Sequence, residues 1–270
     1  MQITDDQKTT FLDELWYHYA RLARNTLPWR QFPDGQFDAY AIMVSEIMLQ
    51  QTQATRVITK YQEFLRVFPD VHSLAGASLG SVLRVWQGLG YNRRAKYIWQ
   101  AAQQISRAGE FPTSRDGLRN LPGIGSNTAG AIMAYTWNRP EIFVETNVRT
   151  VLFHHFFPDR EQVSDGELST VLAQLIDHES PRQFYWAMMD YGSLLKTRVR
   201  NNSQSRHYTK QGKFEGSKRQ IRGKVLSQLT AGSLGLTDLE TLITDARLVQ
   251  VLDDLVSEGL VQMSGNTYSL

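Results

Sequence analysis

The feature that most constrains the fold is a glycine motif near the middle of the chain, Leu121-Pro122-Gly123-Ile124-Gly125. Ser126, Asn127 and Thr128 follow it directly, and residues of this kind are preferred where a helix begins. The pattern predicts a tight hairpin that opens onto a helix, with glycines that allow positive φ and a close approach by another backbone. The N–H groups of the hairpin and of the first helical turn have no partners inside the helix, so they can hold an anion. An ordinary turn between two helices is the alternative, because short glycine motifs are weak evidence alone.

Helical spacing of apolar residues dominates the chain around this motif. It runs through residues 5–24, 41–52, 73–86, 97–105, 129–135 and 165–195, and a further helix is expected to begin near Glu145. No alternation of apolar and polar residues, the pattern typical of half-buried strands, appears in residues 1–195. The sequence therefore predicts an all-α domain over residues 1–195.

Composition excludes several classes of protein. The chain has 270 residues, 41% of them hydrophobic, which is enough for one large domain or two smaller ones. It has no apolar run long enough to span a membrane and no signal-peptide pattern, so we expect a cytoplasmic, nucleoid-associated location. It also has no cysteine. Disulfides, thiolate nucleophiles, cysteine-ligated zinc and cysteine-ligated iron–sulfur clusters are therefore excluded.

Charge is distributed unevenly along the chain. Residues 196–224 hold ten Lys or Arg and one acid, Glu215, whereas the remainder holds 19 basic and 26 acidic residues. A basic block of this kind is either a solvated, flexible segment or a surface for nucleic acid. We predict a basic linker or DNA-binding arm over residues 196–219.

The last fifty residues form a separate pattern. Three short helices are predicted over residues 219–229, 236–243 and 246–258, and alternation around Gly265-Asn266 indicates a hairpin. This arrangement, over residues 220–270, resembles a winged-helix module. Such modules bind DNA, a partner protein or their own main domain, and the sequence leaves all three open.

Two acids stand out against apolar surroundings. Glu46 interrupts the apolar helix predicted over residues 41–52, and carboxylates are seldom fully buried without partners. It either swings out to solvent or to an arginine, or it is desolvated with a raised pKa suited to proton transfer near neutral pH. Glu145 is expected in the first turn of a helix, where the helix dipole favours an acid whatever its function.

Polar and aromatic residues nearby suit nucleic acid. Gln50 and Gln51 end the helix that carries Glu46, and glutamine side chains can hydrogen-bond base edges. Trp29 and Arg30 begin a loop; they are either core residues or an exposed pair that stacks on a base and contacts phosphate. The glycine turn at residues 88–90 is followed by an aromatic residue and three cations.

Four motifs together resemble one family. Residues 45–53, 88–91, 121–132 and 187–192 are similar to motifs of the helix–hairpin–helix DNA glycosylases, most of all the MutY-type adenine-DNA glycosylases. The match covers roughly residues 10–200, in order and with similar spacing. The resemblance implies an all-α fold of two helical lobes around a cleft within residues 1–195. It also implies an enzyme that flips a base out of the duplex and cuts its N-glycosidic bond.

The resemblance also implies roles for single residues. Glu46 matches the glutamate that protonates the adenine ring, and Glu145 stands where the family has an aspartate that stabilises the sugar cation. This is the two-carboxylate arrangement used on glycosides, and it requires the two groups to differ in protonation. Gln50, Gln51 and Tyr91 match residues that intrude into the duplex around the vacated base. The other residues implied to bind DNA are Trp29, Arg30, Arg93, Gly123, Gly125, Ser126, Asn127, Thr128, Asn147 and Arg149, and the backbone carbonyls of Leu121 and Ile124 are implied to hold an alkali cation.

Departures from the family pattern carry information. Glu145 is one methylene longer than aspartate, and a displacement of about 1 Å at a reacting centre can be costly. Asn127 occupies the position of the lysine nucleophile of bifunctional relatives, and asparagine cannot form a Schiff base. Lys196 stands near the first cysteine position of the family's iron–sulfur cluster, which this cysteine-free chain cannot hold. The C-terminal domain with which MutY enzymes sense 8-oxoguanine is not evident.

The sequence thus predicts a monomeric, monofunctional DNA glycosylase without a cofactor and without efficient lyase activity. Its expected partner is double-stranded DNA with a mismatched or damaged base, and the first expectation is adenine opposite 8-oxoguanine or guanine. One alternative is a thymine or uracil mismatch glycosylase of the same fold. The other is a catalytically silent protein that binds mismatched or abasic DNA, which the replacement of the aspartate by Glu145 makes credible.

Overall fold

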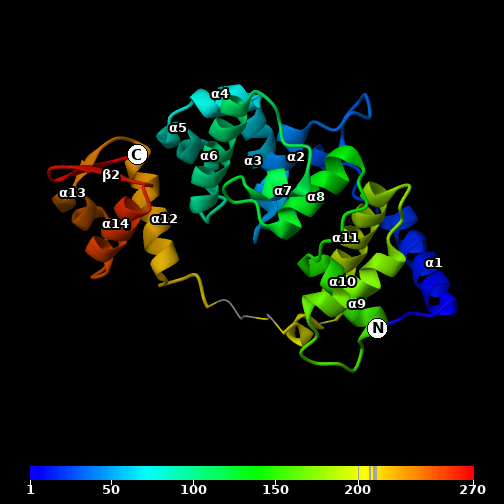
Figure 1. The fold of residues 1–270 in the computed structure, drawn as a ribbon. Coiled ribbons are helices and arrows are strands. Elements are labelled where there is room, and N and C mark those ends of the chain that lie inside the picture. Colours follow the sequence, from blue (N-terminus) through cyan, green and yellow to red (C-terminus); the bar gives the residue numbers. More distant parts are fainter. Residues whose placement is uncertain (200, 207, 209–211) are drawn as a thin grey trace. The chain divides into compact units, whose positions relative to one another are not determined.

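The computed structural model describes residues 1–199, 201–206, 208 and 212–270. Arg200 and Lys210, two cations of the basic block, lie outside the described residues. The elements, in chain order, are α1 (Asp5–Leu22), η1 (Pro28–Arg30), α2 (Ala39–Leu49), α3 (Ala54–Val67), α4 (Val71–Gly76), α5 (Leu79–Trp86), α6 (Arg93–Ala108), α7 (Arg115–Arg119), α8 (Ser126–Trp137), α9 (Thr146–Phe156), α10 (Asp165–Leu175), α11 (Pro181–Arg198), η2 (Asn201–Gln204), α12 (Lys218–Leu229), β1 (Leu234–Gly235), α13 (Leu236–Leu242), α14 (Leu248–Ser257), β2 (Gln262–Ser264) and β3 (Thr267–Ser269) (Figure 1). The all-α prediction for residues 1–195 is confirmed, because residues 1–199 hold helices and no named strand. No helix among the described residues is both long and apolar enough to cross a membrane.

Two boundaries differ from the sequence prediction for identifiable reasons. The single helix expected over 73–86 is divided into α4 and α5, because the Ser78 side chain accepts a hydrogen bond from the Ser81 N–H and starts a new helix. The helical stretch predicted over 165–195 is also divided, into α10 and α11. Here Pro181 begins α11 at the first helical position, where proline is favoured.

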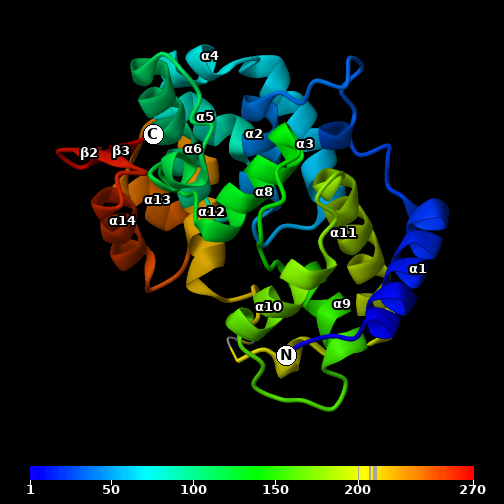
Figure 2. The same cartoon turned by 45° about the vertical axis from the view of Figure 1, so that its right-hand side comes forward.

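The chain packs as two compact units, each built from segments far apart in the sequence. The first unit consists of Met1–Glu46, Pro112–Asn120 and Ile124–Lys210, and the second of Ile47–Phe111, Leu121–Gly123 and Gln211–Leu270. In the first unit α9 lies against both α10 and α11, and α1 runs along α11 (Figures 1 and 2). The predicted boundaries at residues 195 and 219 stay predictions.

A half-buried histidine joins three helices of the first unit. His155 on α9 lies 3.0 Å from the Tyr191 hydroxyl of α11, which donates to Glu14 of α1 at 2.5 Å. The edge of the His155 ring meets the Phe11 ring, with centroids 5.1 Å apart. Burial lowers the pKa of His155 to about 4. The folded protein therefore binds fewer protons here than the unfolded chain, whose histidine titrates near ~6.5.

We expect this histidine to make stability depend on pH. Its contribution is complete above pH ~6.5 and is lost as the pH falls toward ~4, because only the unfolded chain gains the proton in that interval. The loss is about 2 kcal/mol after a discount for the solvent exposure of this half-buried ring. Urea unfolding of the wild type and His155→Gln at pH 7.5, 6.0 and 5.0 measures it, with the exposed His178→Gln as control. An equally steep pH dependence in His155→Gln would contradict the assignment.

The second unit includes the C-terminal module. The three predicted helices are α12, α13 and α14, and the predicted hairpin is the β2–β3 pair, in which Met263 faces Tyr268. A two-residue strand, β1, which the sequence reading missed because it is so short, pairs with β3 to complete a sheet of order β1-β3-β2. The module therefore has the arrangement of a winged helix.

Contacts within the second unit hold this module on α5 and α6. Glu258, at the end of α14, accepts from Arg93 of α6 at 2.6 Å and from Arg222 of α12 at 3.0 and 2.5 Å. Hydrogen bonds from Arg93 and Arg222 lower the pKa of Glu258 to about 2. A Cβ on Gly80 of α5 would lie 3.2 Å from the Leu270 carbonyl oxygen. Of the three partners considered for the module, the structure shows contacts with the main domain.

Candidate active site

Glu46 lies in the strongly apolar helix α2. Its neighbours in α2 that are fully buried include Val44, Ile47 and Met48, and Glu46 itself is 8% exposed. Burial raises its pKa well above the ordinary value, and the negative charge of Glu145 raises it further, whereas Arg30 lowers it. The alternative in which this side chain reaches solvent is wrong. Burial of this carboxyl therefore favours its protonated form.

Glu145 is the N-cap residue of α9 and is half-buried. Burial raises its pKa, and the cations Arg149 and Lys196 lower it. The peptide before it is clamped by the Asn127 side chain, whose Nδ2 donates to the Val144 carbonyl at 3.0 Å and whose Oδ1 accepts from the Val144 N–H at 3.3 Å. The helix predicted to begin near Glu145 is confirmed, and Asn127 fixes the backbone from which this carboxylate extends.

The charges of both carboxyls act on the hydroxyl of Tyr135 in α8. Burial raises the pKa of this phenol well above its usual value, and the charges of Glu46 and Glu145 add to that effect. The same argument separates the two acids. The pKa of Glu46 is raised more, because the negative charge of Glu145 acts on it. The pKa of Glu145 is raised less, because two cations, Arg149 and Lys196, lower it. Of the two acids, Glu46 is the one whose protonated form the surroundings favour more, and two-carboxylate glycoside chemistry needs an asymmetry of this kind.

Arg30, whose charge lowers the pKa of Glu46, belongs to a buried ion network. Asp190 of α11 accepts from the Arg30 guanidinium at 2.7 and 3.0 Å and from Arg24 Nε at 2.6 Å. The Arg30 side chain is only 4% exposed. The expectation that Arg30 contacts DNA from the surface is therefore wrong, because the acid that holds it lies 160 residues away and the sequence does not reveal the pairing. Trp29 is 6% exposed and belongs to the core, so the surface stacking considered for it is also wrong.

The glycine hairpin is partly as predicted. Gly123 has φ +79°, and a Cβ there would lie 2.7 Å from Tyr97 Cβ, so this position requires glycine. Gly125 is different: it has φ −83° and serves as the N-cap of α8, and no heavy atom lies within 4 Å of a Cβ built on it. Gly125 therefore does not use the positive φ that glycine allows, although its open surroundings still permit close approach by another backbone. Ser126 accepts a hydrogen bond from Arg115 at 3.0 Å.

Gln51 and Tyr91 have positive φ angles, +55° and +47°, which are uncommon for non-glycine residues and occur where a site is held under strain. Arg94 lies beneath both turns in the second unit. Its guanidinium donates to the carbonyls of Met48 at 2.8 Å and Gly90 at 3.1 Å. Sequence reasoning missed this buried arginine, whose only signal was its place in the cationic run after the glycine turn.

The remaining candidates have partners inside the protein. Arg149 makes a two-point ion pair with Asp165, at 3.0 and 2.6 Å, and its side chain is 19% exposed. An acid of α10 thus engages its guanidinium, and the predicted contact of Arg149 with DNA stays a prediction. Arg93 is paired with Glu258 but is 58% exposed. Asn147 Nδ2 lies 3.8 Å from the sulfur of Met189. The roles predicted for Gln50, Thr128 and the carbonyls of Leu121 and Ile124 stay predictions.

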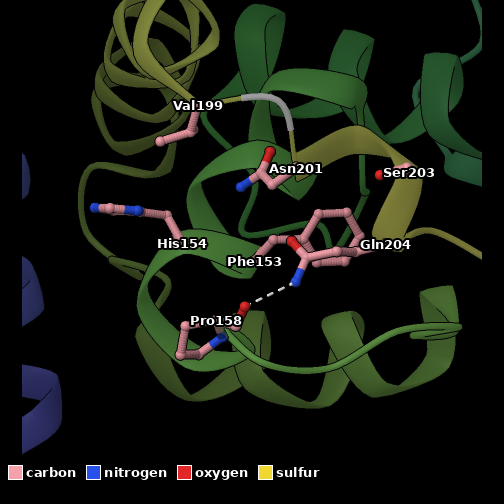
Figure 3. Close-up of a pocket in the computed structure, with 7 residues that line it drawn as sticks. All are labelled: Phe153, His154, Pro158, Val199, Asn201, Ser203 and Gln204. Atoms are coloured by element: carbon pink, nitrogen blue, oxygen red, sulfur yellow. Dashed lines mark hydrogen bonds between the residues drawn. The ribbon is translucent and has the colours of Figure 1, made fainter.

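A surface pocket of about 350 Å³ lies elsewhere in the first unit (Figure 3). Gln204 of η2 donates to the Pro158 carbonyl at its edge, at 3.2 Å. None of the predicted site residues lines this pocket, whose walls are Phe153, His154, Pro158, Val199, Asn201, Ser203 and Gln204. No cluster of metal-ligating side chains occurs in the part of the chain that the structure describes.

Comparisons with known proteins agree with this geometry. A family model described as the HhH-GPD superfamily of base excision DNA repair proteins matches residues 44–176. The adenine DNA glycosylase of Mycobacterium tuberculosis is 31% identical over 272 residues, which cover 91% of this chain and 88% of that one. The adenine DNA glycosylase of Buchnera aphidicola subsp. Baizongia pistaciae is 34% identical over 186 residues, or 67% of this chain, and the chain spans about half, 50%, of that relative's length. The solved structure of a thermostable thymine-DNA glycosylase shares the fold, with a TM-score of 0.63 and 21% identity over 72% of this chain and 89% of that one. The chain therefore belongs to the helix–hairpin–helix superfamily of base excision DNA repair proteins, the family predicted from its motifs.

Proposed function

We propose that this protein is a DNA glycosylase that excises a mismatched base, with adenine opposite 8-oxoguanine or guanine as the first substrate. The observation that carries the proposal is a pair of carboxyls, the buried Glu46 and the half-buried Glu145, whose surroundings raise the pKa of Glu46 more than that of Glu145. The resemblance of the motifs to MutY-type enzymes, and the similarity to proteins named adenine DNA glycosylase, support the choice of base. The DNA partner is a duplex, bound by a monomer without a cofactor.

The reaction follows from the two protonation states. Glu46 donates its proton to a ring nitrogen of the flipped adenine, which makes the base a better leaving group. The C1′–N9 bond then breaks with its electron pair going to the base, and the Glu145 carboxylate stabilises the positive charge that develops on the sugar. Water adds at C1′ and loses a proton, which leaves free adenine and an abasic site. General acid catalysis of this kind contributes about 10²- to 10⁴-fold to the rate.

We further propose that the enzyme does not cut the DNA strand efficiently. At the position of the lysine nucleophile of bifunctional relatives it has Asn127, whose amide is engaged with the Val144 peptide at 3.0 and 3.3 Å. An amide forms no Schiff base with the abasic sugar. Abasic sites should therefore accumulate intact until alkali is added.

Single-turnover excision on a panel of duplexes tests the function. The panel holds A opposite 8-oxoguanine, A opposite G, T opposite G and U opposite G, each analysed with and without alkali. Release of adenine, with strand breaks only after alkali, supports the proposal. Release of thymine or uracil instead assigns the enzyme to mismatched pyrimidines. Tight binding without release from any duplex indicates a silent binder, and Glu145→Asp is then the variant that asks whether the longer side chain is responsible.

A further inference from the structure

Helix α11 approaches the first turn of α9 unusually closely. A Cβ on Gly192 of α11 would lie 2.8 Å from the Asn147 carbonyl carbon and from Asn147 Cβ, distances that real side chains do not adopt. Glycine at this position therefore lets the two helices touch backbone to backbone. The part of α9 that is touched lies two residues after Glu145, its N-cap residue.

Lys196 follows Gly192 by four residues and so lies on the same face of α11. Long side chains on a helix extend back over the turn N-terminal to their own Cα, which carries the Lys196 stem toward Gly192 and the start of α9. The electrostatics agree with this direction. Lys196 lowers the pKa of Glu145, and Glu145 raises the pKa of Lys196, which burial lowers.

Arg149 and Lys196 are the two cations that act on Glu145, and they differ in what else they bind. Arg149 lies on α9, the helix whose N-cap is Glu145, and its guanidinium makes a two-point ion pair with Asp165. Among the described residues, no carboxylate oxygen lies within 4.0 Å of the Lys196 ammonium. The other titratable groups near Glu145 are Glu46, Tyr135 and Tyr185, and none of these supplies a positive charge.

We propose that Lys196 is a positioning residue that acts through Glu145: its ammonium, held on the face of α11 that touches the first turn of α9, favours the ionised form of that carboxylate. The inference rests on the proposed function for its catalytic meaning, but the charge coupling is a property of the folded protein alone. Removing the cation favours the neutral form of Glu145, so the carboxyl takes up a proton at a higher pH. The enzyme then loses activity on the acid side of its pH profile, where Glu145 must be charged.

Carbon NMR of protein labelled with ¹³C at the glutamate carboxyls tests the coupling without any substrate. The spectra are recorded over pH 4–9 for the wild type, Lys196→Met and Lys196→Arg, and Glu145→Gln assigns the resonance. We expect the titration of Glu145 to move up by about one pH unit in Lys196→Met and to stay near wild type in Lys196→Arg. Lys224→Met, which removes one exposed positive charge from the same basic block, should leave it unchanged. No movement in Lys196→Met overturns the inference.

Single-turnover excision against pH tests the catalytic meaning, on whichever duplex the wild type cuts. The acid limb of the Lys196→Met profile should move up by about the same unit, with a three- to tenfold lower rate at pH 6.5 and DNA affinity within threefold of wild type. A rate and profile equal to wild type with weaker DNA binding would overturn the inference, because that result makes Lys196 a phosphate contact. If the wild type cuts no duplex, the proposed function fails while the NMR titration still decides the coupling.

Discussion

Glu46→Gln is expected to reduce base release in a single turnover by about 10²- to 10⁴-fold while leaving DNA affinity within threefold of wild type. Glutamine has nearly the same shape and hydrogen-bonding capacity as a protonated glutamate, so the 8% exposed site should accept it without a cavity or a new buried charge. What is lost is the proton that the leaving base needs, and general acids contribute about 10²- to 10⁴-fold. Single-turnover excision measures the loss, and fluorescence anisotropy with the same duplex measures the affinity.

Glu63→Gln is the matched control for this substitution. Glu63 is on α3, its side chain is 38% exposed, and it is paired with Lys60. The same chemical change there should alter the excision rate less than twofold. If Glu46→Gln retained a rate within tenfold of wild type, Glu46 would not be the proton donor and the proposed chemistry would need another acid.

Asp190→Ala is expected to lower the free energy of unfolding by about 3–5 kcal/mol, the cost of leaving a buried arginine without its partner. The Asp190 carboxylate accepts four hydrogen bonds from Arg24 and Arg30, at distances from 2.6 to 3.0 Å. Its side chain is 2% exposed, so water does not take the carboxylate's place. Urea unfolding at pH 7.5 measures the loss.

Two further variants make the Asp190 prediction decisive. Asp116→Ala removes an exposed carboxylate, 88% accessible, from a pair with Arg119 and should cost less than about 0.5 kcal/mol. If Asp190→Ala does not fold, Asp190→Asn keeps the shape and some of the hydrogen bonds and should lose about 2 kcal/mol. A loss below about 1 kcal/mol in Asp190→Ala would show that the two arginines find other partners.

Local pattern was sufficient where a residue's environment is set by its own helix. Glu46 was found because apolar residues surround it at helical spacing, and the structure confirms that it is buried. The same spacing located twelve of the fourteen α-helices among the described residues, although α3 and α7 were overlooked. The hairpin glycine Gly123 was found because two glycines two residues apart, followed by residues that start a helix, predict a tight hairpin.

The sequence was insufficient where a role depends on a partner from a distant segment. The sequence left Arg30 as either a core or a surface residue because nothing nearby reveals Asp190, and it did not show that Arg149 pairs with Asp165. Asn127 was expected to matter through the amine that it lacks, whereas the structure gives it a second use as a clamp on Val144. These pairings arise from tertiary packing, which residue spacing along the chain does not encode.

The interleaved origin of the two units has a consequence for how the protein is made. The first unit brings Met1–Glu46 together with Ile124–Lys210, and the second completes itself with Gln211–Leu270. A chain emerging from the ribosome therefore exposes apolar helices such as α2 and α5 until much later segments are synthesised. Contacts of such long sequence separation slow folding and lengthen exposure to aggregation. Production at low temperature and a slow rate of synthesis should therefore raise the soluble yield.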